Sequence, residues 1–140
     1  MSNIRDLLYG DIRVTFLLLD PNSEQVDIQS KIYHAVQDLK ESIKKSIKLL
    51  CDEKTRLPPN KRGNLIIRLY DHEPKHGLII TDEGHENAWI KVEARPLGSD
   101  SNSRPSDAWY KRYDPSRYSQ YMHEYDTLFH NSKDYRCPTS

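Results

Sequence analysis

The feature that most constrains the fold is an uninterrupted apolar run near the N-terminus. Residues 13–20 are Arg-Val-Thr-Phe-Leu-Leu-Leu-Asp, and the turn-forming residues Pro21, Asn22 and Ser23 follow at once. A short β-branched and aliphatic run that ends in such a turn predicts a strand buried on both faces. The chemistry of the turn is also that of a helix start.

A long helix is expected after this turn. Asn22 is a suitable N-cap, and Gln25, three residues later, completes a capping box. Apolar side chains then recur at steps of three and four, which places them on one helical face. They are Ile32, Val36, Leu39, Ile43, Ile47 and Leu50. The pattern ends near residue 51, and residues 52–63, which are rich in Pro, Asn and Gly, predict an exposed loop.

Three further strands are expected over residues 64–71, 77–81 and 88–95, with short polar breaks between them. Residues 97–107 contain few apolar side chains and predict a loop. Asp114-Pro115 then starts a second helix, whose aromatic stripe we expect to pack on the sheet. The stripe comprises Tyr118, Tyr121, Met122, Tyr125, Leu128 and Phe129.

The predicted fold class is therefore α/β, with a single mixed β-sheet in the order β-α-β-β-β-α. The long helix is a right-handed crossover between parallel strands, and the short breaks imply antiparallel neighbours. We expect one domain over residues 1–131 and a tail over residues 132–140. We expect the ligand-binding edge of the sheet to lie beyond the carboxyl end of the first strand, near Asp20.

Composition narrows the function classes. The 21 basic residues balance the 21 acidic residues, so the formal net charge is zero and a generic nucleic-acid binder is disfavoured. No apolar run approaches the ~20 residues that span a bilayer, and the N-terminus lacks a signal-peptide pattern. Two cysteines, Cys51 and Cys137, are too few for a disulfide framework, which indicates a reducing cytoplasm. We interpret Cys51 as structural or incidental.

Residues 72–76, His-Glu-Pro-Lys-His, match the zinc-protease pattern His-Glu-x-x-His. That chemistry needs a helix, on which the two histidines share one face. Pro74 and the flanking strands argue against a helix here. The acidic turn at residues 82–86 lies at the other end of the intervening strand from His72 and His76, too far to complete a ligand set. We expect no metal and no cofactor.

Residues 40–62 carry eight basic and three acidic side chains, which could contact phosphates. No aromatic residues are interleaved, so the signature of single-strand stacking is missing and an ordinary solvated helix face is favoured. Nucleic acid is thus a weakly supported partner.

Trp89 and Trp109 could form an exposed aromatic patch.

Asp20 and Arg68 are charged side chains in or beside apolar strands, where a charge is costly unless it is paired or used. One interpretation is a partly buried ion pair or a capping contact. The other is a ligand-facing pair at the edge of the sheet.

The run from Gly10 to Ser23, the long helix, and the segments Leu65–Asp71 and Gly77–Asp82 together resemble one half of a phospholipase D-like domain. They are most similar to the degenerate bacterial version, which is often attached to regulatory DNA-binding modules. Active members use His-x-Lys-x-x-x-x-Asp, with a covalent histidine nucleophile and a charge-neutralising lysine. With Asp82 aligned on the last position, Lys75 stands in place of the histidine and Gly77 in place of the lysine.

The resemblance implies a non-catalytic sensory or regulatory module that binds a small molecule or a protein partner. Asp20, Arg68 and Asp82 are the predicted ligand-binding residues. Exposed sheet edges predict a homodimer. The alternative from the enzyme class is a divergent phosphodiesterase or nuclease that uses His76, or His72, with Asp82. A further alternative is a nucleic-acid-binding accessory protein that uses residues 40–62.

Overall fold

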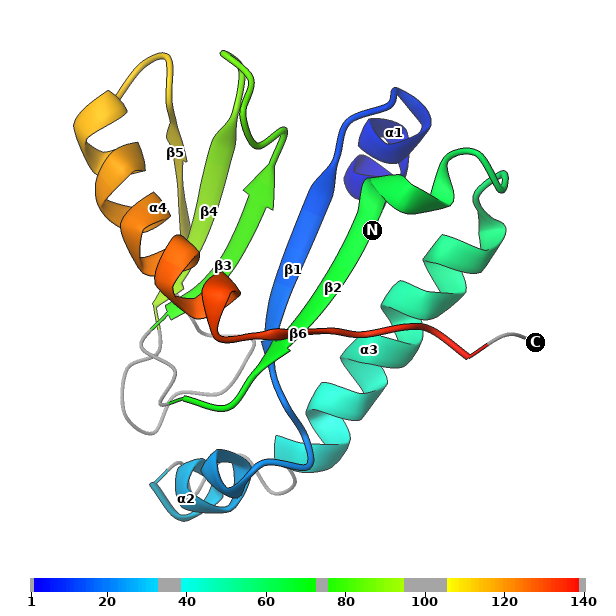
Figure 1. Cartoon of the computed structure of the whole chain (residues 1–140), viewed down its shortest axis with the longest axis vertical. Helices are drawn as coiled ribbons and strands as arrows, with labels where there is room; N and C mark the ends of the chain where they lie inside the picture. The colour runs from blue at the N-terminus through cyan, green and yellow to red at the C-terminus, as the bar shows by residue number, and fades with distance from the viewer. Residues whose placement is uncertain (1, 33–38, 73–75, 95–105, 139–140) are drawn as a thin grey trace.

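The computed structural model in Figure 1 describes residues 2–32, 39–72, 76–94 and 106–138. The prediction of an α/β fold on one mixed sheet is confirmed. No helix in the described ranges has the length and apolar character needed to cross a membrane. The elements in chain order are α1 (Ser2–Tyr9), β1 (Val14–Leu19), α2 (Glu24–Ile32), α3 (Leu39–Arg56), the 3-10 turn η1 (Arg62–Asn64), β2 (Leu65–Tyr70), β3 (His76–Thr81), β4 (Trp89–Ala94), β5 (Ser106–Tyr110), α4 (Pro115–His130) and β6 (Lys133–Asp134).

The sheet has the strand order β5-β4-β3-β1-β2-β6. β1 and β2 are parallel, as the crossover predicted, with Val14 opposite Leu65. Every other pairing is antiparallel. β3 pairs with β1 rather than with β2, so the expectation that β2 and β3 are neighbours is wrong. A link of five residues easily spans the ~10 Å across one intervening strand, which is why a short break did not require adjacency.

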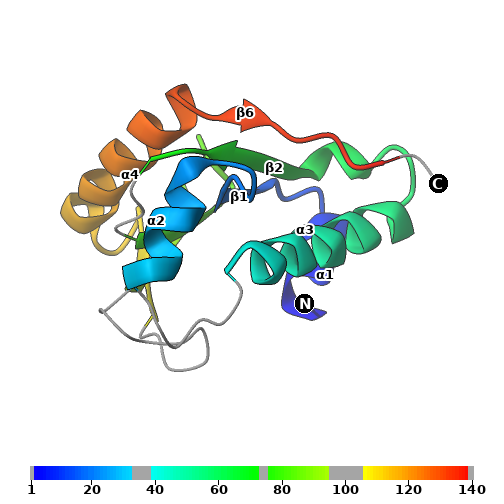
Figure 2. The same cartoon turned by 90° about the horizontal axis from the view of Figure 1, so that it is seen from below.

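Side chains alternate between the two faces of the sheet and build two cores. The core on the α4 face includes Leu17, Leu19, Tyr70, Ile80, Ile90, Tyr118 and Tyr125. The core on the α3 face includes Leu8, Val14, Phe16, Ile47, Leu50, Leu65 and Ile67. Figure 2 shows α4 on one side of the sheet and α1 with α3 on the other. The interpretation of the tyrosine stripe as core is confirmed, since Tyr118 and Tyr125 are buried.

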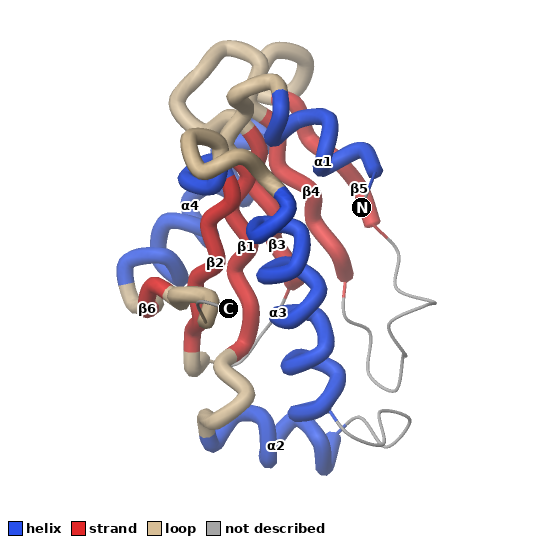
Figure 3. Tube along the Cα trace, turned by 90° about the vertical axis from the view of Figure 1, so that its right-hand side faces the viewer, coloured by secondary structure: helices blue, strands red, loops and turns tan. Residues whose placement is uncertain are grey.

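The predicted single crossover helix consists of two helices. α2 and α3 run in different directions in Figure 3, and residues 33–38 between them lie outside the described residues. Val26 of α2 and Leu39 at the start of α3 belong to the core on the α4 face, whereas Ile47 and Leu50, further along α3, belong to the other core. The contacts of the chain therefore pass from one core to the other along α3.

The sequence pattern does not predict three short elements: α1, β5 and β6. α1 covers Val14 with Leu8, and β5 begins at Ser106, inside the predicted loop of residues 97–107. The part of that loop before residue 106 lies outside the described residues. β6 lies in the predicted tail and pairs with β2. α3 also extends to Arg56, past the predicted start of the loop. Each missed element is too short to establish a hydrophobic period of its own.

Candidate functional site

Asp20, the first of the predicted ligand residues, lies directly after β1. Its carboxylate accepts a hydrogen bond from the Asn22 backbone N over 2.9 Å, and its carbonyl accepts one from Ser23 Oγ over 2.8 Å. These bonds form a tight turn, after which α2 begins at Glu24; the N-cap position is therefore Ser23 rather than Asn22. Asp20 thus shapes the chain at the carboxyl end of β1.

Arg68, the second predicted ligand residue, has a structural task. Its Nε donates to Ser132 Oγ over 2.8 Å, and its Nη2 donates to the carbonyls of Ser132 (2.8 Å) and Phe129 (3.3 Å). The guanidinium also lies 4.2 Å from the centre of the Phe129 ring. Arg68 therefore satisfies carbonyls at the end of α4, as a cation at a helix C-terminus does. The interpretation as a capping contact fits this geometry.

Asp82, the third, lies at the opposite end of the sheet from Asp20. Its backbone N donates to the Arg13 carbonyl, just before β1, whereas Asp20 follows the other end of β1. The three predicted ligand residues therefore share no pocket. His76 begins β3 and Asp82 follows it, so their backbones are about 20 Å apart at ~3.3 Å per residue. The His-Asp pair of the enzyme alternative is thus not brought together.

A groove of about 640 Å³ lies along α3. This volume is in the range of small-molecule sites. One end is formed by Pro21 and Asn22, at the carboxyl end of β1, where the ligand edge was predicted. We call it the α3 groove, and its lining comprises Pro21, Asn22, Lys44, Ile47, Lys48, Cys51, Asp52, Thr55, Arg56, Leu69, Tyr135 and Pro138.

The rim of the α3 groove is basic and its floor is apolar. Lys44, Lys48 and Arg56 line it, and Asp52 is the acidic residue among its described lining. Lys44 lies 3.7 Å from the exposed Glu41, and Lys48 makes no hydrogen bond or ion pair to any described residue. Because exposed ion pairs are weak, both lysines can turn toward a ligand at little cost. The groove therefore suits an anion that carries an apolar group.

The other cations of the basic segment 40–62 are largely occupied within the protein. Lys54 Nζ donates to the Leu65 carbonyl over 2.9 Å, and Lys61 pairs with Asp11. Arg62 donates to the carbonyls of Leu57 and Thr55. The basic segment therefore contains cations bonded within the protein, the three that line the groove, and the exposed Lys40 and Lys45, which do neither among the described residues.

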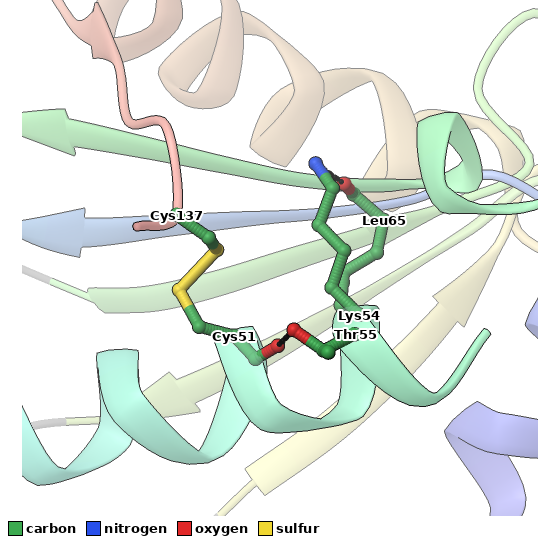
Figure 4. The surroundings of a disulfide bond; sticks show 5 residues. All are labelled: Cys51, Lys54, Thr55, Leu65 and Cys137. Carbon is green, nitrogen blue, oxygen red and sulfur yellow. Dashed lines mark hydrogen bonds between the residues drawn. A yellow bond between two sulfur atoms is a disulfide. The ribbon is translucent and has the colours of Figure 1, made fainter. Parts of the chain in front are cut away.

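The far wall of the groove is the C-terminal segment, residues 131–138. A disulfide joins Cys137 to Cys51 of α3, across a sequence separation of 86 residues (Figure 4). Between Arg68 and this disulfide, the Tyr135 backbone N donates to the Ile67 carbonyl over 2.9 Å. The described part of the predicted tail is thus held at Ser132 and at Cys137. Cys51, interpreted as structural or incidental, has a structural role, and the expectation that the two cysteines indicate a reducing compartment did not include a bond between them.

A buried carboxylate positions α3 relative to the N-terminus. Glu53 is 8% exposed and accepts from Arg5 Nη2 (2.7 Å) and Nε (3.0 Å), and from Arg56 Nη1 (3.1 Å). The hydrogen bonds from Arg5 lower the pKa of Glu53, with desolvation opposing them. Since Arg56 also lines the groove, this ion pair holds one end of the basic rim in place.

On the opposite face, α4 holds the turn that carries Asp82. The buried Tyr125 hydroxyl donates to Glu83 Oε2 over 3.3 Å. Burial, followed by the charge of Glu83, raises the pKa of Tyr125, so the phenol stays protonated. Asp114 caps α4 through the Arg117 backbone N, as its Asp-Pro start predicted.

No protein-family model, curated protein or solved structure matches this chain. Within the described ranges, no group of three or more His, Cys, Asp or Glu side chains is arranged to hold a metal. The proposed function therefore depends on the geometry of the α3 groove. Sequence reasoning noted the basic segment but missed the groove, because its far wall comes from the C-terminal segment.

Proposed function

We propose that this chain is a non-catalytic binding module that takes an anionic ligand in the α3 groove and serves as a sensory or regulatory unit. The ligand is a small molecule with a phosphate or carboxylate beside an apolar group, or the acidic segment of a protein partner. The observation that carries this proposal is the basic rim of Lys44, Lys48 and Arg56 over an apolar floor. A half domain of the phospholipase D-like type remains our interpretation of the fold.

The separation of His76 and Asp82 favours binding over phosphodiester hydrolysis, since a nucleophile and its partner must lie within hydrogen-bond reach. The occupied cations of the basic segment also disfavour an extended nucleic-acid surface. The cytoplasm is still a prediction from the cysteine count. The disulfide counts against it, because such bonds persist mainly in oxidising compartments.

We also infer that the chain self-associates through β5. This strand ends the sheet, and among the described residues it pairs with β4 alone. All of its residues except Trp109 are exposed. An unpaired edge of this kind can add a second copy of itself around a two-fold axis. Light scattering is expected to show a dimer, and a monomer at every concentration would contradict it.

The proposed function is tested with 1-naphthyl phosphate, which joins an anion to an apolar ring. Its binding is followed by calorimetry in the wild type and in Lys44→Glu/Lys48→Glu. Reversal of two charges is expected to weaken binding at least about tenfold, or ~1.4 kcal/mol. The matched control is Lys40→Glu/Lys45→Glu, on the same helix but outside the groove lining.

The control pair is expected to bind nearly as the wild type does, and uncharged 1-naphthol is expected to bind weakly to all variants. Equal losses in the two pairs would reduce the effect to net charge and contradict the assignment of the groove. Absence of binding in the wild type would contradict it as well. Hydrolysis of bis(4-nitrophenyl) phosphate by the protein would favour the enzyme alternative.

A further inference from the structure

Another cavity lies at the other end of the sheet, beside α1. Its volume is about 310 Å³. The lining comprises Leu7, Ile12, Thr81, Asp82, Asn87, Ala88, Trp89, Tyr110, Arg112 and Tyr113. β3 ends, β4 begins and β5 ends at this place, as Figure 1 shows at the end of the sheet nearest α1. We call it the aromatic pocket.

Aromatic rings form the outer walls of this pocket. Trp89 and Tyr110 are cross-strand partners with ring centres 6.0 Å apart and planes tilted by 35°. Tyr113 stands edge-on to Tyr110, also at 6.0 Å with an interplanar angle of 66°. Trp109 pairs with Ile90 and packs in the core on the α4 face, so the two tryptophans do not form a common patch. Trp89, Tyr110 and Tyr113 therefore line one and the same cavity.

The polar wall of the pocket includes a carboxylate. Asp82 has a φ of 61°, and its backbone N is fixed by the Arg13 carbonyl at 2.8 Å. Its side chain is 23% exposed, and its ionic neighbour is the exposed His85, at 3.8 Å. An aspartate held in the left-handed region at a pocket wall is positioned by the backbone rather than by a strong counter-ion. The carboxylate thus has capacity for a cationic partner.

A cation already contacts one of the rings. The guanidinium of Arg112 lies 5.8 Å from the centre of the Tyr113 ring. A face of the Tyr113 ring can therefore accept a cation, and in this structure that cation is the protein's own Arg112. Arg112 also lines the pocket, so it would repel a bound cation, and its removal provides a test of the sign of the ligand's charge.

We propose that the aromatic pocket binds a small quaternary ammonium compound. Aromatic faces attract ammonium groups through the ring quadrupole, and methylated ammonium groups gain most because they are weakly hydrated. Asp82 supplies the complementary charge. Thr81, whose buried hydroxyl makes no hydrogen bond to any described residue, also lines the pocket. The proposal stands apart from the α3 groove, which selects the opposite charge.

The probe is choline, followed through the fluorescence of Trp89 in a Trp109→Phe background. The matched control ligand is 3,3-dimethylbutan-1-ol, which has the same shape and no charge. Choline is expected to bind saturably and at least about tenfold more tightly than the alcohol, since a cation–π contact in a partly dry site contributes up to ~2 kcal/mol. Equal binding of the two compounds would overturn the proposal.

Three variants test the charges assigned to the aromatic pocket. Asp82→Asn keeps the shape, and asparagine tolerates the left-handed backbone, so folding is expected to be preserved. It should weaken choline binding about tenfold, whereas Arg112→Gln should strengthen it severalfold. Asp107→Asn, an exposed carboxylate on β5, is the control and should change nothing.

Unchanged affinity in Asp82→Asn, with the thermal unfolding midpoint preserved, would overturn the assignment of the carboxylate. Weaker binding in Arg112→Gln would overturn the assigned charge of the ligand. Lys44→Glu/Lys48→Glu should bind choline as the wild type does. Failure of 1-naphthyl phosphate in the α3 groove therefore leaves this proposal standing, and failure of choline leaves the proposed function standing.

Discussion

The two halves of the sheet differ in how their faces and edges are covered. Around β1 and β2, α1 and α3 cover one face, β6 pairs with the edge, and the Cys51–Cys137 disulfide fixes the C-terminal segment. Around β3, β4 and β5, α4 covers one face of the sheet. Near the other face, at the end of β5, Tyr110 is 42% exposed and Tyr113 is 78% exposed. The enclosed half holds the α3 groove, and the open half holds the aromatic pocket.

Strand composition explains this difference. β1 is apolar at nearly every position and must be covered on both faces. β4 and β5 present polar or exposed residues on one face, including Lys91 and Ala108, so a single covering helix suffices. The comparison predicts that stability is concentrated in the enclosed half, and that changes in the open half alter binding more than folding.

The largest expected effect is loss of the disulfide in the enclosed half. Cys137→Ser should lower the free energy of unfolding by about 4.5 kcal/mol, because the bond closes a loop of 86 residues in the unfolded chain. Urea unfolding with and without dithiothreitol measures it. The double variant Cys51→Ser/Cys137→Ser should be insensitive to the reductant. Equal stability of the oxidised and reduced wild type would show that the enclosed half does not depend on this bond.

The second-largest expected effect on stability comes from substituting Arg68. Arg68→Met keeps the contact with Phe129 but removes the hydrogen bonds to the carbonyls of Phe129 and Ser132, which should cost about 2 kcal/mol. Arg136→Met, on the exposed part of the C-terminal segment, is the control. If the two variants unfold at the same urea concentration, Arg68 is not the anchor of α4 and β6 described above.

In the open half, Thr81→Val should increase stability by about 1 kcal/mol. The buried Thr81 hydroxyl makes no hydrogen bond within the described ranges, and valine has the same shape without the polar atom. Thermal unfolding at constant pH is the measurement. A destabilised variant would indicate that the hydroxyl is satisfied in solution, by water or by a ligand.

The smallest effect concerns pH. The pKa of Glu53 is lowered below its ordinary value of 4.5, so its contribution is fully present above that value and is lost as pH falls through the folded pKa. Glu53→Gln should therefore show a shallower loss of stability below about pH 4.5 than the wild type does. The control is Glu41→Gln, on the same helix and exposed. Identical acid profiles for all three proteins would contradict the role of Arg5 and Glu53.

The sequence was informative where apolar side chains are dense. The four central strands and α4 follow from their periodicity, and the Asp114 cap follows from a local rule. α1, β5 and β6 could not be predicted because they gain stability from long-range contacts rather than from a pattern of their own. The order of β2, β1 and β3 was likewise missed, since a short link does not determine adjacency.

The candidate sites were predicted less well than the fold. The prediction near Asp20 points to the end of β1 where the α3 groove begins, because ligand sites tend to follow the carboxyl ends of strands. Arg68 attracted attention through its charge in a strand, yet that charge serves the end of α4. The walls of the α3 groove come from residues 21, 48 and 135, and no local pattern joins positions so far apart.

The central claim is that the α3 groove is the binding site for an anion. It is tested most directly by backbone amide NMR during titration with 1-naphthyl phosphate. The account predicts saturable shifts at Asn22, Lys44 and Lys48, with the indole signal of Trp89 unchanged. Shifts centred on β5, or no shifts in the groove at saturation, would contradict it.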